Sequence, residues 1–313
     1  MNLIFSAFAA MDGFRENADV NANRGRAVYY RCLVVALVSA KQQNPDCEVA
    51  LVTNDPLPAP FDSQLARAGV TIYTCPFDTF RFAADLPWSL AFYKLCAMNW
   101  VLNNLTFDLC VMLDTDTYTQ YPLTDLWREA DEAVLLYQVP HPASQPMAAA
   151  ISGCCDALYP DGAPHVLTHF GGELLAGSAP RLRSFLSLCR EIYDEMQARN
   201  VMPQDGDEVI LCIAAWRALQ NGQPVRAANA YIWRYWLGAR HYFVSTNYCL
   251  VPICILHLPG SGKDRQLKLL YRHYAKHGIF PDRKAVWRLC GMPAAHPPLF
   301  NTLRVRLLAA LPD

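Results

Sequence analysis

The chain lacks several features that would place it in other classes of protein. Charged residues make up only 18% of its 313 residues, against about 25% in typical domains, and the formal net charge is −1. The small net charge argues against a protein that binds nucleic acid through its bulk charge. The hydrophobic content of 53% excludes an intrinsically disordered chain. No apolar run approaches the roughly 18 residues that a membrane-spanning helix requires.

Cysteine motifs and a basic leader are also missing. The 12 cysteines are scattered, none of them forms a CxxC pair, and most lie inside apolar runs, which is typical of buried reduced thiols. The apolar segment 3–11 has no basic residues before it, and Asp12 follows at once. It therefore predicts a first strand rather than a secretory signal. We expect a cytoplasmic protein.

What the first 140 residues do contain is an alternation of strand and helix patterns. Apolar runs predict strands at 3–9, 47–53, 70–75, 109–113 and 133–138, and helical spacing predicts helices at 24–43, 61–68 and 93–105. This rhythm indicates an α/β fold with a mostly parallel central sheet. Ligands of such sheets bind at the carboxyl ends of the strands. Further on, helices are predicted at 181–200 and 209–219, and a last strand at 251–256.

The sharpest local signal is Asp114-Thr115-Asp116, which directly follows the predicted strand Leu109–Leu113. Two carboxylates at positions i and i+2 can turn toward one divalent cation, and their hard oxygen atoms suit Mn²⁺ or Mg²⁺. Such an ion would neutralise a nucleotide diphosphate. The alternatives are a solvated acidic turn and a haloacid-dehalogenase-like phosphatase, in which Asp114 would be the nucleophile. That family normally carries its motif on the first strand of the chain.

Other motifs accompany this pair in a fixed order. Tyr93-Lys94-Leu95 precedes it, and Phe170-Gly171-Gly172-Glu173, an acidic helix start at Asp207-Glu208, and finally His257, Gly260, Gly262 and Lys263 follow it. The series resembles the nucleotide-sugar glycosyltransferases of the A-type (GT-A) fold. The last motif is similar to the HxxGxxK motif of family 8, the glycogenin-like group, and the middle ones look like those of the blood-group-type retaining transferases.

The resemblance implies a single Rossmann-like GT-A domain over residues 1–262 and a metal-dependent transfer of a hexose from a UDP-sugar to a saccharide or other hydroxyl acceptor. Retention of configuration is expected, because both resembling families retain it. A catalytically degenerate sugar-nucleotide-binding module is a further alternative.

The resemblance also implies roles for individual residues. The metal, Mn²⁺ or Mg²⁺, would be held by Asp114, Asp116 and His257. The catalytic residues would be Glu173, Asp207 and Glu208. The donor would be bound by Ala7, Phe8, Ala9, Lys94, Asp114, Thr115, Gly171, Gly172, Gly260, Gly262 and Lys263.

The total charge is near neutral, but positive and negative residues are distributed unevenly along the chain. Residues 263–313 carry ten Lys or Arg and three Asp, a net charge of +7, which leaves −8 for residues 1–262. We expect this segment to be a helical, basic extension packed on the domain. Its basic residues alternate with leucines and aromatics, a composition that suits peripheral contact with the inner membrane surface and a glycolipid acceptor. An ordinary helical cap is the alternative, and a glycan or protein acceptor is equally open. No motif indicates a nucleic-acid partner.

Overall fold

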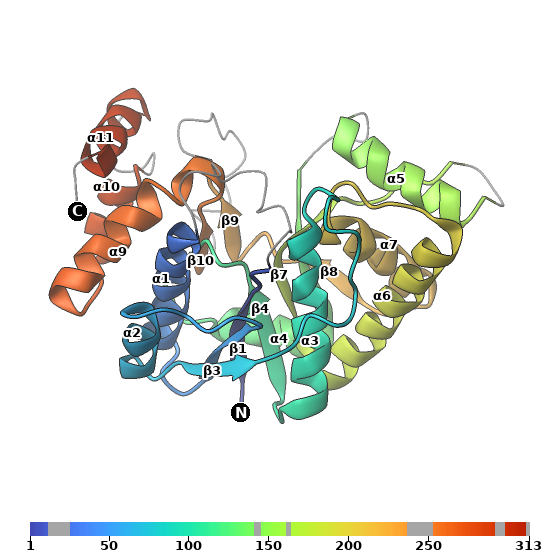
Figure 1. Cartoon of the computed structure of the whole chain (residues 1–313), viewed down its shortest axis with the longest axis horizontal. Coiled ribbons are helices and arrows are strands. Elements are labelled where there is room, and N and C mark those ends of the chain that lie inside the picture. The colour runs from blue at the N-terminus through green and yellow to red at the C-terminus, as the bar shows by residue number, and fades with distance from the viewer. Residues whose placement is uncertain (12–25, 141–144, 161–163, 237–252, 292–297, 311–313) are drawn as a thin grey trace.

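The computed structural model describes residues 1–11, 26–140, 145–160, 164–236, 253–291 and 298–310. A central sheet of seven strands has the order β3-β2-β1-β4-β7-β6-β8, and a small sheet has the order β5-β10-β9 (Figure 1). The strands of the central sheet are β1 (Leu3–Phe8), β2 (Glu48–Thr53), β3 (Thr71–Thr74), β4 (Leu109–Leu113), β6 (Val134–Gln138), β7 (Phe170–Ser178) and β8 (Val225–Ala227). Those of the small sheet are β5 (Thr117–Thr119), β9 (Ile232–Arg234) and β10 (Ile255–His257).

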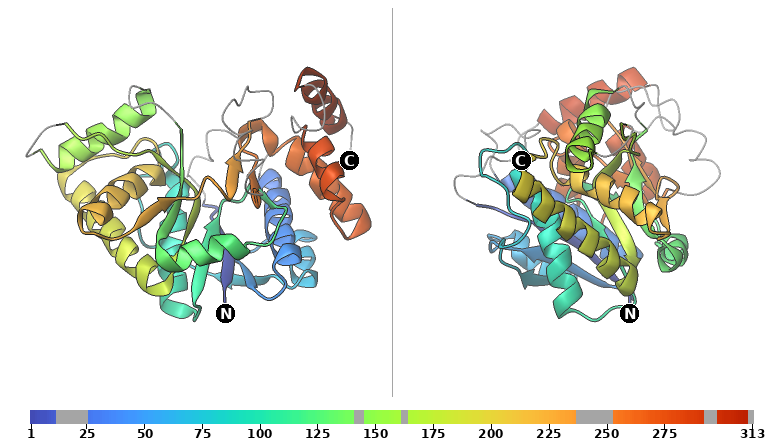
Figure 2. Two further views of the ribbon diagram at one scale, coloured as in Figure 1. Left: turned by 180° about the vertical axis from the view of Figure 1, so that it is seen from behind. Right: turned by 90° about the vertical axis from the view of Figure 1, so that its right-hand side faces the viewer.

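Helices cover both faces of the central sheet, as the continuous apolar strands predict. The strands β1 and β4 have alternate side chains in two separate cores, with Phe5 and Met112 in one and Ile4 and Val111 in the other. The first core also contains residues of α3, α6 and α7, and the second contains residues of α1, α2 and α4. Figure 2 shows α6 and α3 side by side in the view from the right-hand side of Figure 1.

The helices account for most of the remaining described chain. They are α1 (Ala27–Gln43), α2 (Phe61–Arg67), α3 (Tyr93–Asn104), α4 (Thr124–Glu132), α5 (Pro146–Leu158), α6 (Ala179–Arg199), α7 (Asp207–Gln220), α9 (Gln266–His277), α10 (Arg283–Cys290) and α11 (Pro298–Ala310), with short 3₁₀ turns η2 (Ser89–Phe92) and η3 (Gly260–Gly262).

The α/β class and the mostly parallel sheet are confirmed. The pairs β1–β2, β1–β4, β2–β3 and β6–β8 are parallel, whereas β7 runs antiparallel to both β4 and β6. The sequence prediction missed β7 and took Phe170–Glu173 for a connecting motif, because glycine and glutamate disfavour strands. It also missed α5 and the short strands β5, β8 and β9. The predicted strand 251–256 is found only in part, because β10 begins at Ile255 and ends at His257, residues 253–254 are not in a strand, and 251–252 lie outside the described residues.

The small sheet brings His257, the first residue of the predicted HxxGxxK motif, to the acidic pair. Its central strand, β10, runs antiparallel to β5, with His257 opposite Thr117, and parallel to β9, with His257 beside Arg234. Since β5 begins one residue after Asp116, this register places His257 against the carboxylates. The pairing of distant segments, rather than local sequence, thus assembles the site.

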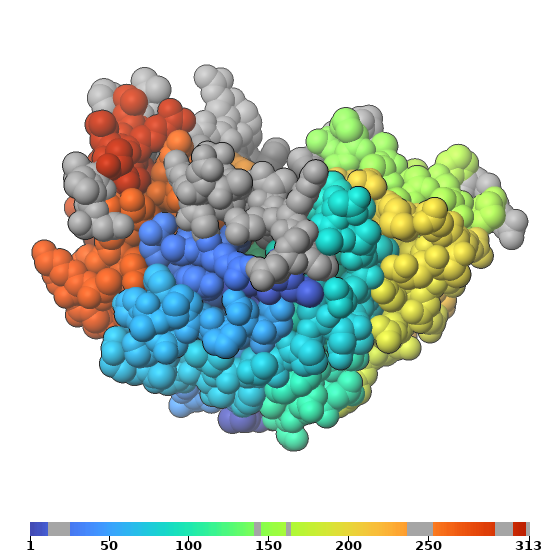
Figure 3. All heavy atoms as spheres, viewed as in Figure 1, coloured from blue at the N-terminus to red at the C-terminus, as the bar shows by residue number. Residues whose placement is uncertain are grey.

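The C-terminal residues form helices that pack on the domain. Leu267 and Leu270 of α9 and Val286 of α10 share a core with Val28 and Val35 of α1. In Figure 3 these C-terminal helices occupy one flank of the molecule, and α5 and α6 occupy the other. Among the described residues, no helix combines the length and the apolar content needed to cross a membrane.

Candidate metal centre and adjoining cavity

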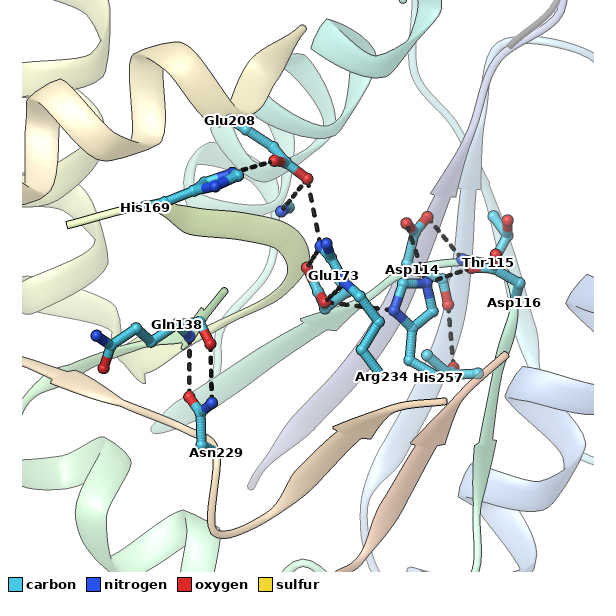
Figure 4. Close-up of polar contacts among 12 residues, drawn as sticks. Asp114, Thr115, Asp116, Gln138, His169, Glu173, Glu208, Asn229, Arg234 and His257 are labelled. Carbon is cyan, nitrogen blue, oxygen red and sulfur yellow. Dashed lines mark hydrogen bonds and ion pairs between the residues drawn. The ribbon is translucent and has the colours of Figure 1, made fainter. Parts of the chain in front are cut away.

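Asp114, Asp116 and His257 converge at the carboxyl end of β4. One ligand atom of each lies within 4.8 Å of those of the other two. His257 Nε2 is 3.1 Å from Asp116 Oδ1 and 4.0 Å from Asp114 Oδ2 (Figure 4). The Asp116 side chain is 2% exposed and that of Asp114 is 32% exposed, so the pair has one buried and one accessible carboxylate. Two carboxylate oxygens and an imidazole nitrogen make a donor set that fits Mn²⁺ or Mg²⁺.

Backbone contacts fix the loop that carries the two carboxylates. The Asp114 N–H donates to the Glu173 carbonyl at 2.9 Å, which continues the pairing of β4 with β7 past the end of the strand. Thr115 N–H donates to Asp114 Oδ1 at 2.9 Å, and Leu258 N–H donates to the Asp116 carbonyl at 2.9 Å. The loop is therefore tied to both β7 and β10, and its side chains are held in place before any ligand binds.

Charged neighbours set the protonation states of this centre. Burial opposes ionisation of Asp116, but Lys263, 2.7 Å away, and His257 outweigh it and hold the pKa of that carboxyl well below its usual range. Burial likewise acts to lower the pKa of His257, but Asp116 and Glu173 raise it to about 9. The sequence predicted Lys263 as a ligand of the donor diphosphate. In the structure its ammonium group lies against Asp116, next to the metal ligands.

A cavity of about 320 Å³ adjoins Asp114, the accessible carboxylate of the centre. Eight of the predicted site residues line it, namely Ala7, Phe8, Ala9, Lys94, Asp114, Thr115, Asp207 and Glu208. The lining further includes Arg26, Tyr29, Trp88, Met147 and Asp205, none of which the sequence analysis assigned to the site. The predicted base pocket at the end of β1 and the acidic start of α7 thus face one space. The other eight predicted site residues are not part of this lining, namely Asp116, Gly171, Gly172, Glu173, His257, Gly260, Gly262 and Lys263.

Asp207 and Glu208 occupy the first turn of α7, where the helix dipole favours negative charge. Glu208 is held by the His169 ring, with Nε2 2.7 Å from Oε2, by Arg234 at 3.4 Å and by the Gly172 N–H at 3.4 Å. Burial opposes its ionisation, but the contacts with His169 and Arg234 lower the pKa of Glu208 below its usual value. Glu208 is therefore a preformed carboxylate on the cavity wall.

Asp207 is paired with Lys94 of α3. Lys94 Nζ is 2.9 Å from Asp207 Oδ2 and donates to the Gly172 carbonyl at 3.0 Å. Burial raises the pKa of Asp207 to about 6, and the attraction of Lys94 limits the rise. The pair joins α3, β7 and α7 at the wall of the cavity.

The raised pKa of Asp207 predicts a pH dependence of stability. The native state binds a proton between pH ~4 and ~6 that the unfolded state releases, so this group's favourable contribution is complete below pH ~4 and lost as the pH rises through about 6. A rise in the pKa of Asp207 from 3.8 to about 6 corresponds to about 3 kcal/mol. Urea unfolding across pH 4–7 is expected to show that the wild type loses this amount relative to Asp207→Asn. If the free energy of unfolding of the two proteins changed in parallel between pH 4 and pH 7, the predicted contribution of Asp207 would be contradicted.

Gly172 is required where β7 passes the Lys94–Asp207 pair. A Cβ atom on Gly172 would lie 2.4 Å from Lys94 Nζ and 2.6 Å from Asp207 Oδ2, which are far shorter than allowed contacts. Gly172→Ala is therefore expected to separate the pair and to lower the free energy of unfolding by about 1–3 kcal/mol. At Gly153 on α5, no atom of the described residues outside its chain neighbours and its own helix backbone lies within 4 Å of the corresponding position.

The matched control is Gly153→Ala, which is expected to raise stability by about 0.5–1 kcal/mol, because alanine favours a helix over glycine. Chemical denaturation of the two variants measures the difference. Equal effects of the two substitutions would show that the space around Gly172 is not restricted.

Sequence reasoning missed Arg234, which contacts both Glu173 and Glu208. Its side chain is 16% exposed and lies between Trp233 and Tyr235 in an otherwise apolar strand. An arginine inside an apolar strand of a chain with few charges is itself a signal, because burial of a charge requires a partner. His169, which contacts Glu208, was likewise not assigned a role.

The fold and these motifs define the class of the molecule as an α/β protein with a GT-A-like arrangement. No protein-family model matches the chain, and a search of curated proteins found no match. Among solved structures, the chain is similar to an active-site mutant of LgtC, with a TM-score of 0.52 and 16% identity over 82% of this chain and 86% of that one. LgtC is a retaining galactosyltransferase of family 8 with the GT-A fold. The similarity establishes the fold.

Proposed function

We propose that this chain is a metal-dependent glycosyltransferase that transfers a hexose from a UDP-sugar to a hydroxyl acceptor with retention of configuration. The observation that carries the proposal is the convergence of Asp114, Asp116 and His257 beside the cavity, at the carboxyl end of a strand in a GT-A-like sheet. Carboxyl ends of strands are where such sheets bind their ligands.

The residues in and beside the cavity have different roles in the proposed reaction. Asp114, Asp116 and His257 would hold Mn²⁺ or Mg²⁺, which supplies positive charge to the diphosphate as it leaves. Ala7, Phe8 and Ala9 would contact the base of the nucleotide, while Lys94 and Lys263 would add positive charge near the phosphates. Glu208, which is ionised and faces the cavity, would stabilise the positive charge that develops at the anomeric carbon.

A thermal-shift screen tests the proposal. The protein is heated with UDP-, GDP- and CDP-sugars, each with Mn²⁺ and with EDTA. A ligand that binds only the folded state stabilises it by about 2.7 kcal/mol at a hundred times its Kd. We expect the midpoint temperature of unfolding to rise with a UDP-hexose in the presence of Mn²⁺ and to stay unchanged with the same sugar in the presence of EDTA. No shift with any nucleotide sugar would overturn the proposal.

The phosphatase alternative makes the opposite prediction. If Asp114 were a nucleophile toward phosphate esters, the protein would hydrolyse p-nitrophenyl phosphate, and Asp114→Asn would abolish that activity. We expect no such hydrolysis. The degenerate binding module would bind the donor without releasing UDP, so a turnover assay distinguishes it from an enzyme.

We further propose that the C-terminal helices contact an anionic membrane surface, where a glycolipid acceptor would lie. Exposed basic side chains on these helices include Lys276, Arg283, Arg304 and Arg306. Large apolar side chains are exposed among them, with Ile279, Leu303 and Leu307 at 62%, 51% and 70%. Exposed apolar and basic side chains together suit the headgroup region of a bilayer.

Neutralising two of these charges is expected to weaken the binding. Each basic residue near an anionic surface contributes about 1 kcal/mol, so Arg304→Gln with Arg306→Gln should weaken binding to phosphatidylserine-rich vesicles by roughly 30-fold in a sedimentation assay. The controls are phosphatidylcholine vesicles and Arg190→Gln on α6, which lies on the opposite flank (Figure 1). Absent or unchanged binding would show that the helices are only a structural cap.

A further inference from the structure

Glu173 lies next to the metal ligands but away from the reaction space. Its side chain has 0% exposure, and it is not among the residues that line the cavity. It projects from β7, whose backbone at the same residue accepts the hydrogen bond from Asp114 N–H. A carboxylate enclosed in this way cannot reach a sugar in the cavity without rearrangement, so the catalytic role expected from the sequence needs another explanation.

Both oxygen atoms of Glu173 are engaged by neighbouring strands of the small sheet. Arg234 forms a bidentate ion pair with them, with Nε 2.5 Å from Oε1 and one terminal nitrogen 2.6 Å from Oε2. This two-pronged contact is called the Arg234 fork below. His257 Nδ1 lies 3.3 Å from Oε1. Arg234 and His257 are register partners on β9 and β10. One glutamate from the central sheet therefore receives two side chains that the small sheet presents together (Figure 4).

The contact between Nδ1 and Glu173 determines whether Nε2, on the opposite side of the His257 ring, can bind a metal. Binding of a metal requires the lone pair of Nε2, so the proton that the ring keeps must lie on Nδ1, the nitrogen that faces Glu173. That atom points toward Asp116 and Asp114. Metal-binding histidines generally donate their other ring N–H to such an acceptor, which fixes both the tautomer and the ring orientation.

A glycine provides the space for this arrangement. A Cβ atom on Gly171 would lie 2.0 Å from Glu173 Oε2 and 2.3 Å from a terminal nitrogen of Arg234. The side chain missing at Gly171 thus makes room for the Glu173–Arg234 fork. Arg234 also supplies the counter-charge that this buried carboxylate requires, because a charge in the protein interior needs a partner.

From these contacts we infer that Glu173 and Arg234 are positioning residues that orient His257 toward the metal, and that Glu173 is not a nucleophile toward the sugar. The inference rests on the metal site of the proposed function. Beyond that function, it assigns to Glu173 and Arg234 the orientation of one metal ligand, His257, which the sequence motifs did not reveal. Arg234 also contacts Glu208, so the same side chain joins the support of the metal ligand to the carboxylate on the cavity wall.

The test measures Mn²⁺ affinity by electron paramagnetic resonance with the whole chain and no nucleotide sugar. Glu173→Gln is expected to weaken Mn²⁺ binding by about 10- to 100-fold, the usual effect of losing a partner behind a metal ligand. Arg234→Lys, which keeps the charge but loses the fork, should weaken binding in the same direction. Glu208→Gln is the matched control, because it removes the other carboxylate that Arg234 contacts and should leave Mn²⁺ affinity within about twofold.

A second readout separates positioning from catalysis. If Glu173 orients the ligand, turnover by Glu173→Gln recovers most of its kcat when Mn²⁺ is raised to saturation. If Glu173 reacts with the sugar, kcat stays low at every Mn²⁺ concentration, and the inference is overturned. Unchanged Mn²⁺ affinity in Arg234→Lys or in Glu173→Gln would also overturn it, and circular dichroism identifies which variants are folded.

Failure of this inference can be distinguished from failure of the proposed function. If the wild type binds no Mn²⁺, or binds it as well after Asp116→Asn, the metal site and the proposed function fail together. If the wild type binds Mn²⁺ and Asp116→Asn does not, the metal site stands, and the two support variants then decide the role of Glu173 and Arg234 alone.

Discussion

Asp116→Asn is expected to lower the turnover of a nucleotide sugar by about three orders of magnitude. The substitution keeps the size of the side chain but removes the negative charge that faces His257 and Lys263. A metal ion stabilises the charge of a leaving diphosphate by several kcal/mol, and each 1.36 kcal/mol is a factor of ten in rate. Steady-state release of UDP in the presence of Mn²⁺ measures the effect.

A control separates this loss from a general change of charge. Asp131 is exposed at the end of α4, and Asp131→Asn should leave turnover within a factor of two. Melting curves of both variants show whether the fold is kept. Full turnover in folded Asp116→Asn would remove this carboxylate from the chemistry.

Lys94→Met is expected to lower the free energy of unfolding by about 3–5 kcal/mol. Lys94 is 13% exposed and Asp207 is 3% exposed, so loss of the ammonium group leaves a buried carboxylate without its counter-charge. The Gly172 carbonyl loses a donor in the same step. Urea denaturation at pH 7 measures the change, because Asp207, with a pKa of about 6, is largely ionised there.

The double variant Lys94→Met with Asp207→Leu is the matched control. Replacing both members of a buried ion pair by apolar residues of similar size is often neutral or stabilising, so the double variant should regain most of the lost stability. Both proteins should lack activity, because the two residues line the cavity. A double variant no more stable than Lys94→Met would show that the pair is not the source of the effect.

The parts of the fold that local sequence encodes were predicted well. The strands β1, β2 and β4 are short apolar runs that need no polar face, and their order with α1 and α3 follows from the alternation of patterns. Asp114 and Asp116 were found because they end such a strand. Lys94, Asp207 and Glu208 were assigned to the site by resemblance, and the structure brings them to the same cavity.

The parts that depend on distant partners were not predicted. Glu173 and Arg234 are 61 residues apart, and nothing near either residue shows that the other will neutralise it. The strand β7 contains glycines that disfavour a strand but make room for the Arg234 fork and the Lys94–Asp207 pair. Its position is set by pairing with β4 and β6 and by these ion pairs, which a search for local periodicity does not detect.

The central claim is that three side chains from β10 and the loop after β4 hold a metal that this protein uses to cleave a nucleotide sugar. Chromatographic measurement of UDP released from a panel of UDP-hexoses, with and without Mn²⁺, tests it most directly. We predict release that requires Mn²⁺, increases with an acceptor and disappears in Asp116→Asn. Release that is equal with EDTA, or no release from any UDP-hexose, would contradict the claim.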